Sequence, residues 1–191
     1  MSDRRGAQPG DDGKLRCPWA LSTPDYIVYH DDEWGRRLTT DDAMFERLTL
    51  EAFQSGLSWL IVLRKRPGFR AAFDGFSIPT VAAFDDTDVE RLLADAGIVR
   101  NRSKIEAAIS NARAALDLPG GMLAFAESFA PTEPRPAPKT LDDLGSTSAE
   151  STALAKALKA NGFRFVGPTT AHALMQATGL VNDHLADCWV R

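Results

Sequence analysis

The chain has 191 residues, of which 44% are hydrophobic and 25% charged, and its net charge is −4. This composition is typical of a globular protein and excludes both a disordered chain and a uniformly basic nucleic-acid coat, while leaving room for a local basic patch. No apolar run approaches the ~20 residues of a membrane helix, and residues 1–14 lack the apolar stretch of ~7–15 residues that marks a secretory signal. We therefore expect a cytoplasmic protein without membrane association, with a disordered tail at residues 1–14 and a single domain at residues 15–191.

Apolar residues after the tail recur with the period of amphipathic helices. Thr87 and Thr147 each open a capping-box pattern, with Glu90 and Glu150 three residues later. Residues 131–138 contain four prolines, which predict an extended connection. No segment alternates cleanly four times, so strands are at most short and the fold class is all-α. The expected helices span residues 41–54, 55–66, 87–96, 101–116, 121–130, 147–161 and 168–178.

The two cysteines lie at opposite ends of the chain, and each has a histidine nearby in the sequence. Twelve residues separate Cys17 from His30, whereas His184 and Cys188 are four apart, as on one face of a helix. Two thiolates and two imidazoles suit tetrahedral zinc, and four protein ligands would make the metal structural and join the N- and C-terminal segments. The alternative is two buried free cysteines and two ordinary histidines, and the spacing alone leaves both open.

Residues 92–105 read as a helix, a tight turn at Gly97 and the start of a second helix, within a hairpin near residues 87–116. Free N–H groups at a helix start attract anions. The hairpin resembles a helix-hairpin-helix motif for the DNA backbone, although Val99 stands where a second glycine is usual. The other interpretation is a helix corner with solvated charges. The candidate DNA-backbone residues are Gly97, Arg100, Arg102 and Lys104.

Four of the six Trp and Tyr residues lie between positions 26 and 59, namely Tyr26, Tyr29, Trp34 and Trp59. Glu51 lies in the same stretch and borders the apolar face of its helix, three residues after Leu48 and seven after Met44. A carboxylate at such a place needs a partner or a shifted pKa. A pocket of aromatic residues with one acid would suit a flat ligand that is cationic or carries an amine. The alternative is an aromatic core with Glu51 at its edge.

Several motifs in this order resemble the 3-methyladenine DNA glycosylase I family. The resemblance covers residues 16 to about 189. It is carried by Arg16-Cys17-Pro18-Trp19, Tyr26 to Gly35, Leu50-Glu51, Gln54 to Trp59, Ala96 to Arg100, Lys104-Ile105, Gly162 to Gly167 and Gly179 to His184.

The resemblance implies a monofunctional glycosylase of base-excision repair in the helix-hairpin-helix superfamily. It implies one structural zinc held by Cys17, His30, His184 and Cys188, and a base pocket of Glu51, Tyr29, Trp34 and Trp59. The expected substrate is double-stranded DNA with alkylated purines, from which a monomer releases 3-methyladenine. The family lacks the catalytic Asp of its superfamily, so Glu51 is the candidate catalytic residue, acting mainly in recognition and electrostatics.

Two other functions compete with this one. A zinc-stabilised DNA-binding module without catalysis would share the hairpin and the metal, but would need no pocket. A glycosylase for another modified base would share the pocket too. In either glycosylase, the loop at Gly56-Leu57 is expected to fill the gap that a flipped base leaves in the duplex.

Overall fold

The computed structural model describes residues 5–133 and 135–191. Helices predominate in this part of the chain and its strands are two residues long, which confirms the all-α class. Within it, every helix is too short or too polar to cross a bilayer. The elements, in chain order, are β1 (Gln8–Pro9), β2 (Leu15–Arg16), η1 (Pro18–Ser22), α1 (Pro24–Asp32), α2 (Asp41–Gln54), α3 (Trp59–Ala72), η2 (Asp74–Phe76), α4 (Ile78–Ala82), α5 (Asp86–Ala94), α6 (Arg102–Leu116), α7 (Gly121–Glu127), η3 (Leu141–Asp143), α8 (Ala149–Ala160) and α9 (Pro168–Ala177).

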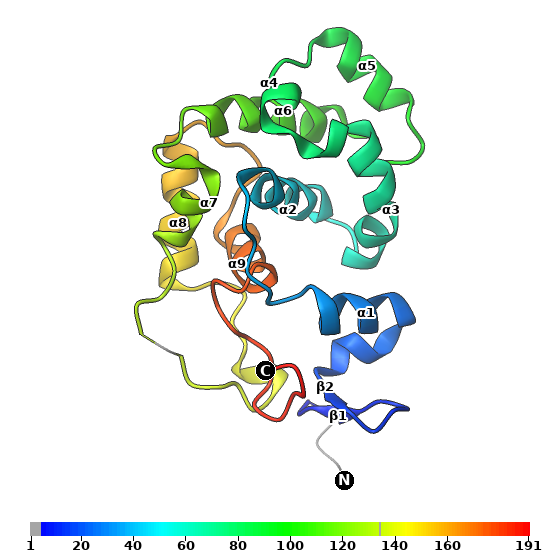
Figure 1. Cartoon of the computed structure of the whole chain (residues 1–191), viewed down its shortest axis with the longest axis vertical. Coiled ribbons are helices and arrows are strands. Elements are labelled where there is room, and N and C mark those ends of the chain that lie inside the picture. Colours follow the sequence, from blue (N-terminus) through cyan, green and yellow to red (C-terminus); the bar gives the residue numbers. More distant parts are fainter. Residues whose placement is uncertain (1–4, 134) are drawn as a thin grey trace.

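Helix α2 is the central element of the fold. Helices α3 to α6 lie on one side of it, and α1 with both chain ends lies on the other, as Figure 1 shows. From Met44 to Phe53 every residue of α2 except Glu46 is buried, and α2 contacts α3, α6, α7 and α9. Because α2 is enclosed on all sides, its polar side chains also point into the interior of the protein. Glu51 is one of these buried polar side chains. Among the largest fully buried side chains are Phe45, Phe53, Phe69, Phe73 and Phe76.

Three helix starts differ from the sequence expectation. The N-cap of α5 is Asp85, not Thr87, and the N-cap of α8 is Ser148, not Thr147. In both cases the residue with extended backbone accepts the N–H bonds of the first turn, and Asp88 and Ser151 complete the boxes that glutamates were expected to complete. The sequence pattern identified the helices but shifted their first residues.

The third difference is α3, which was expected at residues 55–66 but spans Trp59–Ala72. Gly56 has a φ of +83°, so the chain turns there and a helix cannot begin before Ser58. Trp59 thereby becomes the first residue of the helix, at the end that faces α1 and α2 (Figure 1). Helix α1, which carries His30, was not expected.

The prediction of a disordered tail at residues 1–14 is wrong for residues 8–14, which belong to a hairpin. Residues 1–4 lie outside the described part of the chain. Strands β1 and β2 pair antiparallel, with Gln8 opposite Arg16. The Arg16 guanidinium is buried and binds both Asp12, at 2.7 Å, and Asp31, at 2.7 Å. A buried cation between two carboxylates fixes the hairpin to α1. The residues of the hairpin alone do not predict this contact.

Candidate active site and metal centre

A cavity of about 390 Å³ opens between α1, α2, α3 and α9. All five residues expected in the pocket line it, so the structure brings together side chains from three helices and the segment after α1. Five further lining residues were not predicted as part of the pocket. The lining consists of Trp19, Tyr26, Tyr29, Trp34, Glu51, Gln54, Trp59, Leu144, Ala173 and Gln176.

The aromatic rings of the cavity contact one another mainly by their edges. Trp19 lies 5.1 Å from Trp34 at 80° and 5.7 Å from Tyr26 at 89°, while Tyr29 and Trp59 are 5.5 Å apart and tilted by 46°. Edge-to-face contacts between aromatic rings are favourable, so these rings hold one another in place around the cavity. The indole N–H of Trp59 is buried without a hydrogen-bond partner among the described residues. The cavity is therefore mostly apolar, with few polar groups pointing into it.

Glu51 is the acid of this cavity. Only 6% of the residue is exposed, and its carboxyl makes no hydrogen bond or ion pair with the described part of the chain. Burial raises the pKa of Glu51 to about 7, with Arg47 opposing the rise. At neutral pH the carboxyl is thus close to half ionised, and a ligand that brings positive charge or an N–H donor would stabilise the ionised form.

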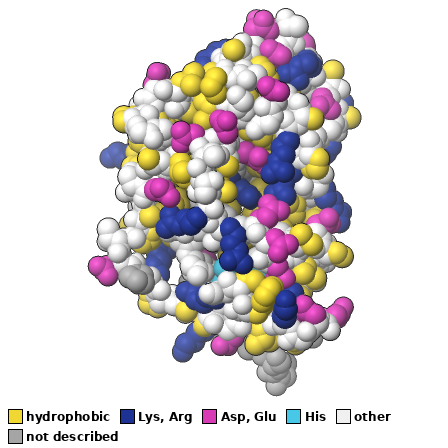
Figure 2. Space-filling view, viewed as in Figure 1, with side chains coloured by type: hydrophobic (Ala, Val, Ile, Leu, Met, Phe, Trp, Pro, Cys, Tyr) yellow, Lys and Arg dark blue, Asp and Glu magenta, His cyan; other side chains and the backbone are white. Residues whose placement is uncertain are grey.

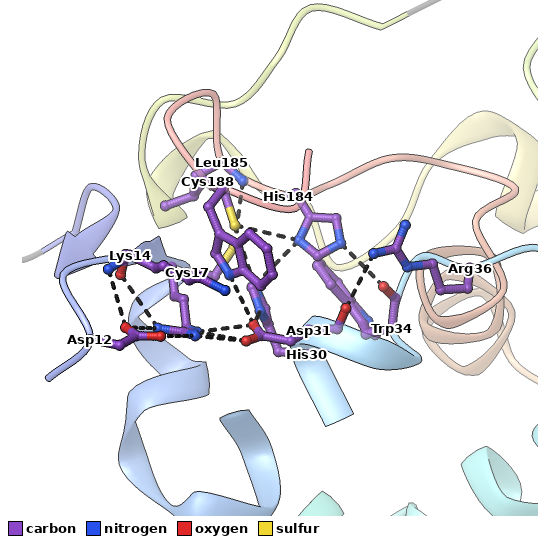
Figure 3. Close-up of polar contacts among 12 residues, drawn as sticks. Asp12, Lys14, Cys17, His30, Asp31, Trp34, Arg36, His184, Leu185 and Cys188 are labelled. Carbon is purple, nitrogen blue, oxygen red and sulfur yellow. Dashed lines mark hydrogen bonds and ion pairs between the residues drawn. The ribbon is translucent and has the colours of Figure 1, made fainter. Parts of the chain in front are cut away.

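The two cysteines and two of the histidines form a buried Cys2His2 group near the C-terminal end of α1, where His30 lies (Figure 3). The Nε2 atom of His30 lies 3.3 Å from Nδ1 of His184 and 3.4 Å from the Cys188 sulfur, which is 3.7 Å from His184 Nδ1. All four potential ligand atoms, that of Cys17 included, lie within 4.8 Å of one another. Four soft and imidazole donors at this spacing could hold a metal ion.

Other groups orient the four side chains. The Nδ1 atom of His30 is 2.8 Å from Asp31, and Nε2 of His184 is 3.1 Å from the carbonyl oxygen of Trp34. Both ring atoms lie opposite the nitrogens that face the cluster, as is usual for histidines that bind metals. The backbone N–H of Leu185 donates to the Cys17 sulfur at 3.4 Å. Hydrogen bonding to Cys17, then to His184 and His30, lowers the pKa of Cys188 and favours a thiolate.

The segment from His184 to Cys188 is a turn and not the expected helix. The two residues converge because Cys188 N–H donates to the Leu185 carbonyl, which closes a tight turn. On the facing segment Gly35 has a φ of +78°, and a Cβ there would come within 2.9 Å of His184. A glycine is therefore required at this approach.

Helices α5 and α6 form the expected hairpin, and its turn packs against α3. A Cβ on Gly68 of α3 would lie 2.6 Å from the Gly97 carbonyl oxygen, so the two backbones touch. The Gly97 N–H donates to Asp95 at 2.6 Å. Arg100 is exposed and has no ion pair among the described residues. Arg102 pairs with Glu90 and, at 3.7 Å, with Glu106.

Lys104 does not belong to this hairpin surface, which corrects the expectation that it contacts phosphate. It is 9% exposed, and its ammonium donates to the carbonyls of Phe53, at 2.8 Å, and Ser55, at 2.6 Å. These carbonyls lie at the C-terminus of α2, where a helix has unsatisfied acceptors and a negative dipole end. Lys104 thus fixes the end of the helix that carries Glu51.

Charges of both signs are interspersed on the face shown in Figure 2, which bears no uniformly basic field.

Several known proteins are similar to this chain. The family model for methyladenine glycosylase matches residues 19–191. DNA-3-methyladenine glycosylase 1 of Escherichia coli (strain K12) is 46% identical over 177 residues, which cover 91% of this chain and 95% of that protein. A crystal structure of 3-methyladenine DNA glycosylase I superposes with a TM-score of 0.87 at 46% identity, covering 91% of this chain and 98% of that one. A tyrosine-to-phenylalanine variant of such an enzyme, in complex with 3-methyladenine, superposes with a TM-score of 0.86 at 33% identity, over 92% and 96%.

The fold and the site define a class of helical proteins in which a buried carboxyl and aromatic rings line one cavity, in a fold that also contains a helical hairpin and a Cys2His2 group. Within that class the chain belongs to the methyladenine glycosylase family, whose model matches nearly its whole length.

Proposed function

We propose that this chain is a DNA glycosylase that releases 3-methyladenine from alkylated DNA by hydrolysing the N-glycosidic bond. The observation that carries the proposal is the unpaired, buried carboxyl of Glu51 in an aromatic cavity of about 390 Å³. Relatives of this family are named for 3-methyladenine, and one was crystallised with it. A base inside a duplex cannot reach such a cavity, so the nucleotide has to be flipped out of the stack.

The positive charge of the substrate explains why a single carboxyl in the cavity is enough for excision of the base. Methylation at N3 gives the purine in DNA a positive charge, so the base leaves readily. Ionised Glu51 attracts this cation and accepts a hydrogen bond from its amine, while Trp34 and Trp59 provide aromatic contacts. The bond between the sugar and the base breaks, and its electron pair neutralises the base. Water adds its oxygen to the sugar carbon and gives its proton to solvent. Neutral adenine leaves far more slowly.

The hairpin between α5 and α6 is proposed to bind the DNA backbone. Arg100 is exposed and free of ion pairs in the described chain, so it is available to phosphate, and Arg102 and the turn at Gly97 lie beside it.

The loop at Gly56-Leu57 lies between Gln54 and Trp59, which both line the cavity. Gly56 is exposed, and a Cβ on it would meet no other atom within 4 Å, which supports a role for this loop in filling the gap left by the flipped base.

Zinc is the metal that the Cys2His2 group fits best. With bonds of about 2.3 Å to sulfur and about 2.05 Å to nitrogen, a tetrahedral ion separates two nitrogens by about 3.3 Å and a sulfur from a nitrogen by about 3.6 Å. The observed separations are 3.3 Å between nitrogens and 3.4 and 3.7 Å between sulfur and nitrogen. When bound, the ion would complete its shell with protein ligands and act structurally. Cys17 and His30 would then be tied to His184 and Cys188.

Identification of the released bases tests the proposal. Methylated duplex DNA is incubated with the protein, and the small molecules set free are identified by mass spectrometry, with Glu51→Gln as the matched control. We expect 3-methyladenine to be released by the wild type and far more slowly by the variant. Release of no base would leave a DNA-binding module, and release of a different base alone would overturn the assigned substrate.

A further inference from the structure

Arg47 is a buried cation beside the cavity to which the proposed chemistry assigns no part. It lies on α2 one turn before Glu51, and residues four apart share a helix face. Only 7% of it is exposed. Its guanidinium donates a hydrogen bond of 3.0 Å to the phenol oxygen of Tyr29 and lies 5.4 Å from the centre of that ring. Burying a guanidinium without hydrogen-bond or ion-pair partners costs free energy of folding, so the partners of Arg47 are what stabilise its buried position.

A carboxylate shared with a second arginine holds Arg47 in place. Its other terminal nitrogen is 3.6 Å from Glu33, and Arg66 donates to the same carboxylate at 2.7 Å. Glu33 lies closer to Arg66 than to Arg47, so the guanidinium of Arg47 is only partly neutralised by it. Glu51 is a further carboxyl near Arg47, one helical turn along α2 and beside Tyr29 in the lining of the cavity.

We propose that Arg47 is a positioning residue of the base pocket, which directs the hydroxyl proton of Tyr29 into the cavity and favours the ionised form of Glu51. A phenol oxygen that accepts a bond from a cation retains its own proton to donate. No acceptor for that proton is present among the described residues, so it remains available to an acceptor atom of a ligand. Tyr29 then meets the ligand as a donor, and Glu51 meets it as an acceptor. The inference rests on the proposed function for its ligand.

The charges around Glu51 support this direction. Burial raises the pKa of Glu51, and the opposite charge of Arg47 lowers it. In general, an opposite charge within about 4–6 Å of a carboxyl lowers its pKa by about 1–3. The charged or titratable groups on the elements around Arg47 and the cavity include Glu46 of α2, which pairs with Arg70 of α3. They also include Tyr26 and Tyr29 on α1, Glu33 at the C-cap of α1, Arg66 on α3, Lys104 on α6 and His172 on α9.

The pKa of Glu51 tests the electrostatic part without any activity. It is measured by NMR on protein with ¹³C-labelled glutamate carboxyls, and the Glu51 signal is assigned by its loss in Glu51→Gln. We expect Arg47→Met, which keeps a long buried chain, to raise this pKa by about 1 unit or more. The matched control is Arg66→Met, which removes the other partner of Glu33 and should leave the pKa in place. Equal pKa values in the two variants would overturn the proposal.

Two further variants separate charge from folding. Arg47→Lys keeps the charge, so the pKa of Glu51 should return toward the wild-type value; a value equal to that of Arg47→Met overturns the electrostatic part. If Arg47→Met does not fold by circular dichroism, Arg47→Gln replaces it, since the amide keeps a donor and loses the charge.

The link to Tyr29 is tested by a double-mutant cycle with Tyr29→Phe. The readout is the affinity for free 3-methyladenine, followed by tryptophan fluorescence. If Arg47 acts through the hydroxyl, Arg47→Met weakens binding several-fold in the wild type and much less in the Tyr29→Phe background. Additive losses would overturn this link. A wild type that neither binds nor excises 3-methyladenine would instead refute the proposed function, while the NMR measurement would still decide the role of Arg47.

Discussion

Replacing Glu51 by Gln should stabilise the protein at alkaline pH while it slows excision. The substitution keeps the shape of the side chain and removes the charge. The pKa of Glu51 rises from its ordinary 4.5 to about 7 on folding, because the carboxyl is buried. At about 1.4 kcal/mol per pH unit, the ionised form costs the folded state about 3 kcal/mol.

The sign of the pH dependence follows from that rise. Between pH 4.5 and 7 the folded protein keeps the Glu51 proton and the unfolded chain has lost it, so this group lowers the stability of the wild type as the pH increases. The cost is complete above pH 7 and absent below pH 4.5. Relative to the wild type, Glu51→Gln should therefore gain about 2.5 kcal/mol between pH 5 and pH 8.

Urea unfolding of both proteins at pH 5 and pH 8, with zinc in excess, measures this gain, because every other titrating group cancels in the comparison. Single-turnover excision of 3-methyladenine at pH 8 should be at least about tenfold slower in the variant, since a charge-assisted bond of about 1.5–3 kcal/mol is lost. A stability difference that is the same at both pH values, or a variant that excises as fast as the wild type, would refute the reasoning.

Three other perturbations probe the metal centre, the hairpin and the end of α2. Cys188→Ser should release near-stoichiometric zinc and lower the melting temperature, because the two chain ends lose their common ligand; elemental analysis that finds no zinc in the wild type contradicts this. Arg100→Ala should weaken binding to damaged and undamaged duplexes alike and reduce the slope of log K against log salt by about 0.9, and a loss confined to damaged DNA would argue against a backbone contact. Lys104→Met should cost about 1.5–3 kcal/mol in urea unfolding and leave that salt slope unchanged, whereas a reduced slope would return Lys104 to the DNA surface.

The sequence by itself determined the class of fold and most of the chemistry. Helical periodicity identified the residues of α2 and α6 because each helix has an apolar face that recurs locally. The four Cys and His side chains were identifiable because few residue types bind metals, and the chain has only two cysteines. Glu51 was identifiable because a carboxylate at the edge of an apolar face is unusual. Their roles in this chain stay predictions for the experiments above.

Only the tertiary structure decided which way individual polar side chains point. Lys104 looked like a surface cation in the sequence, but α6 packs so that its ammonium meets the last carbonyls of α2, about fifty residues earlier. Gln176 and Arg47 had no local signal, since one reaches the cavity from α9 and the other acts through a tyrosine on α1. The hairpin at residues 8–16 depends on Asp31, which lies outside it. A hydrogen bond between distant segments leaves no period in the sequence, because its geometry exists only after the helices have packed.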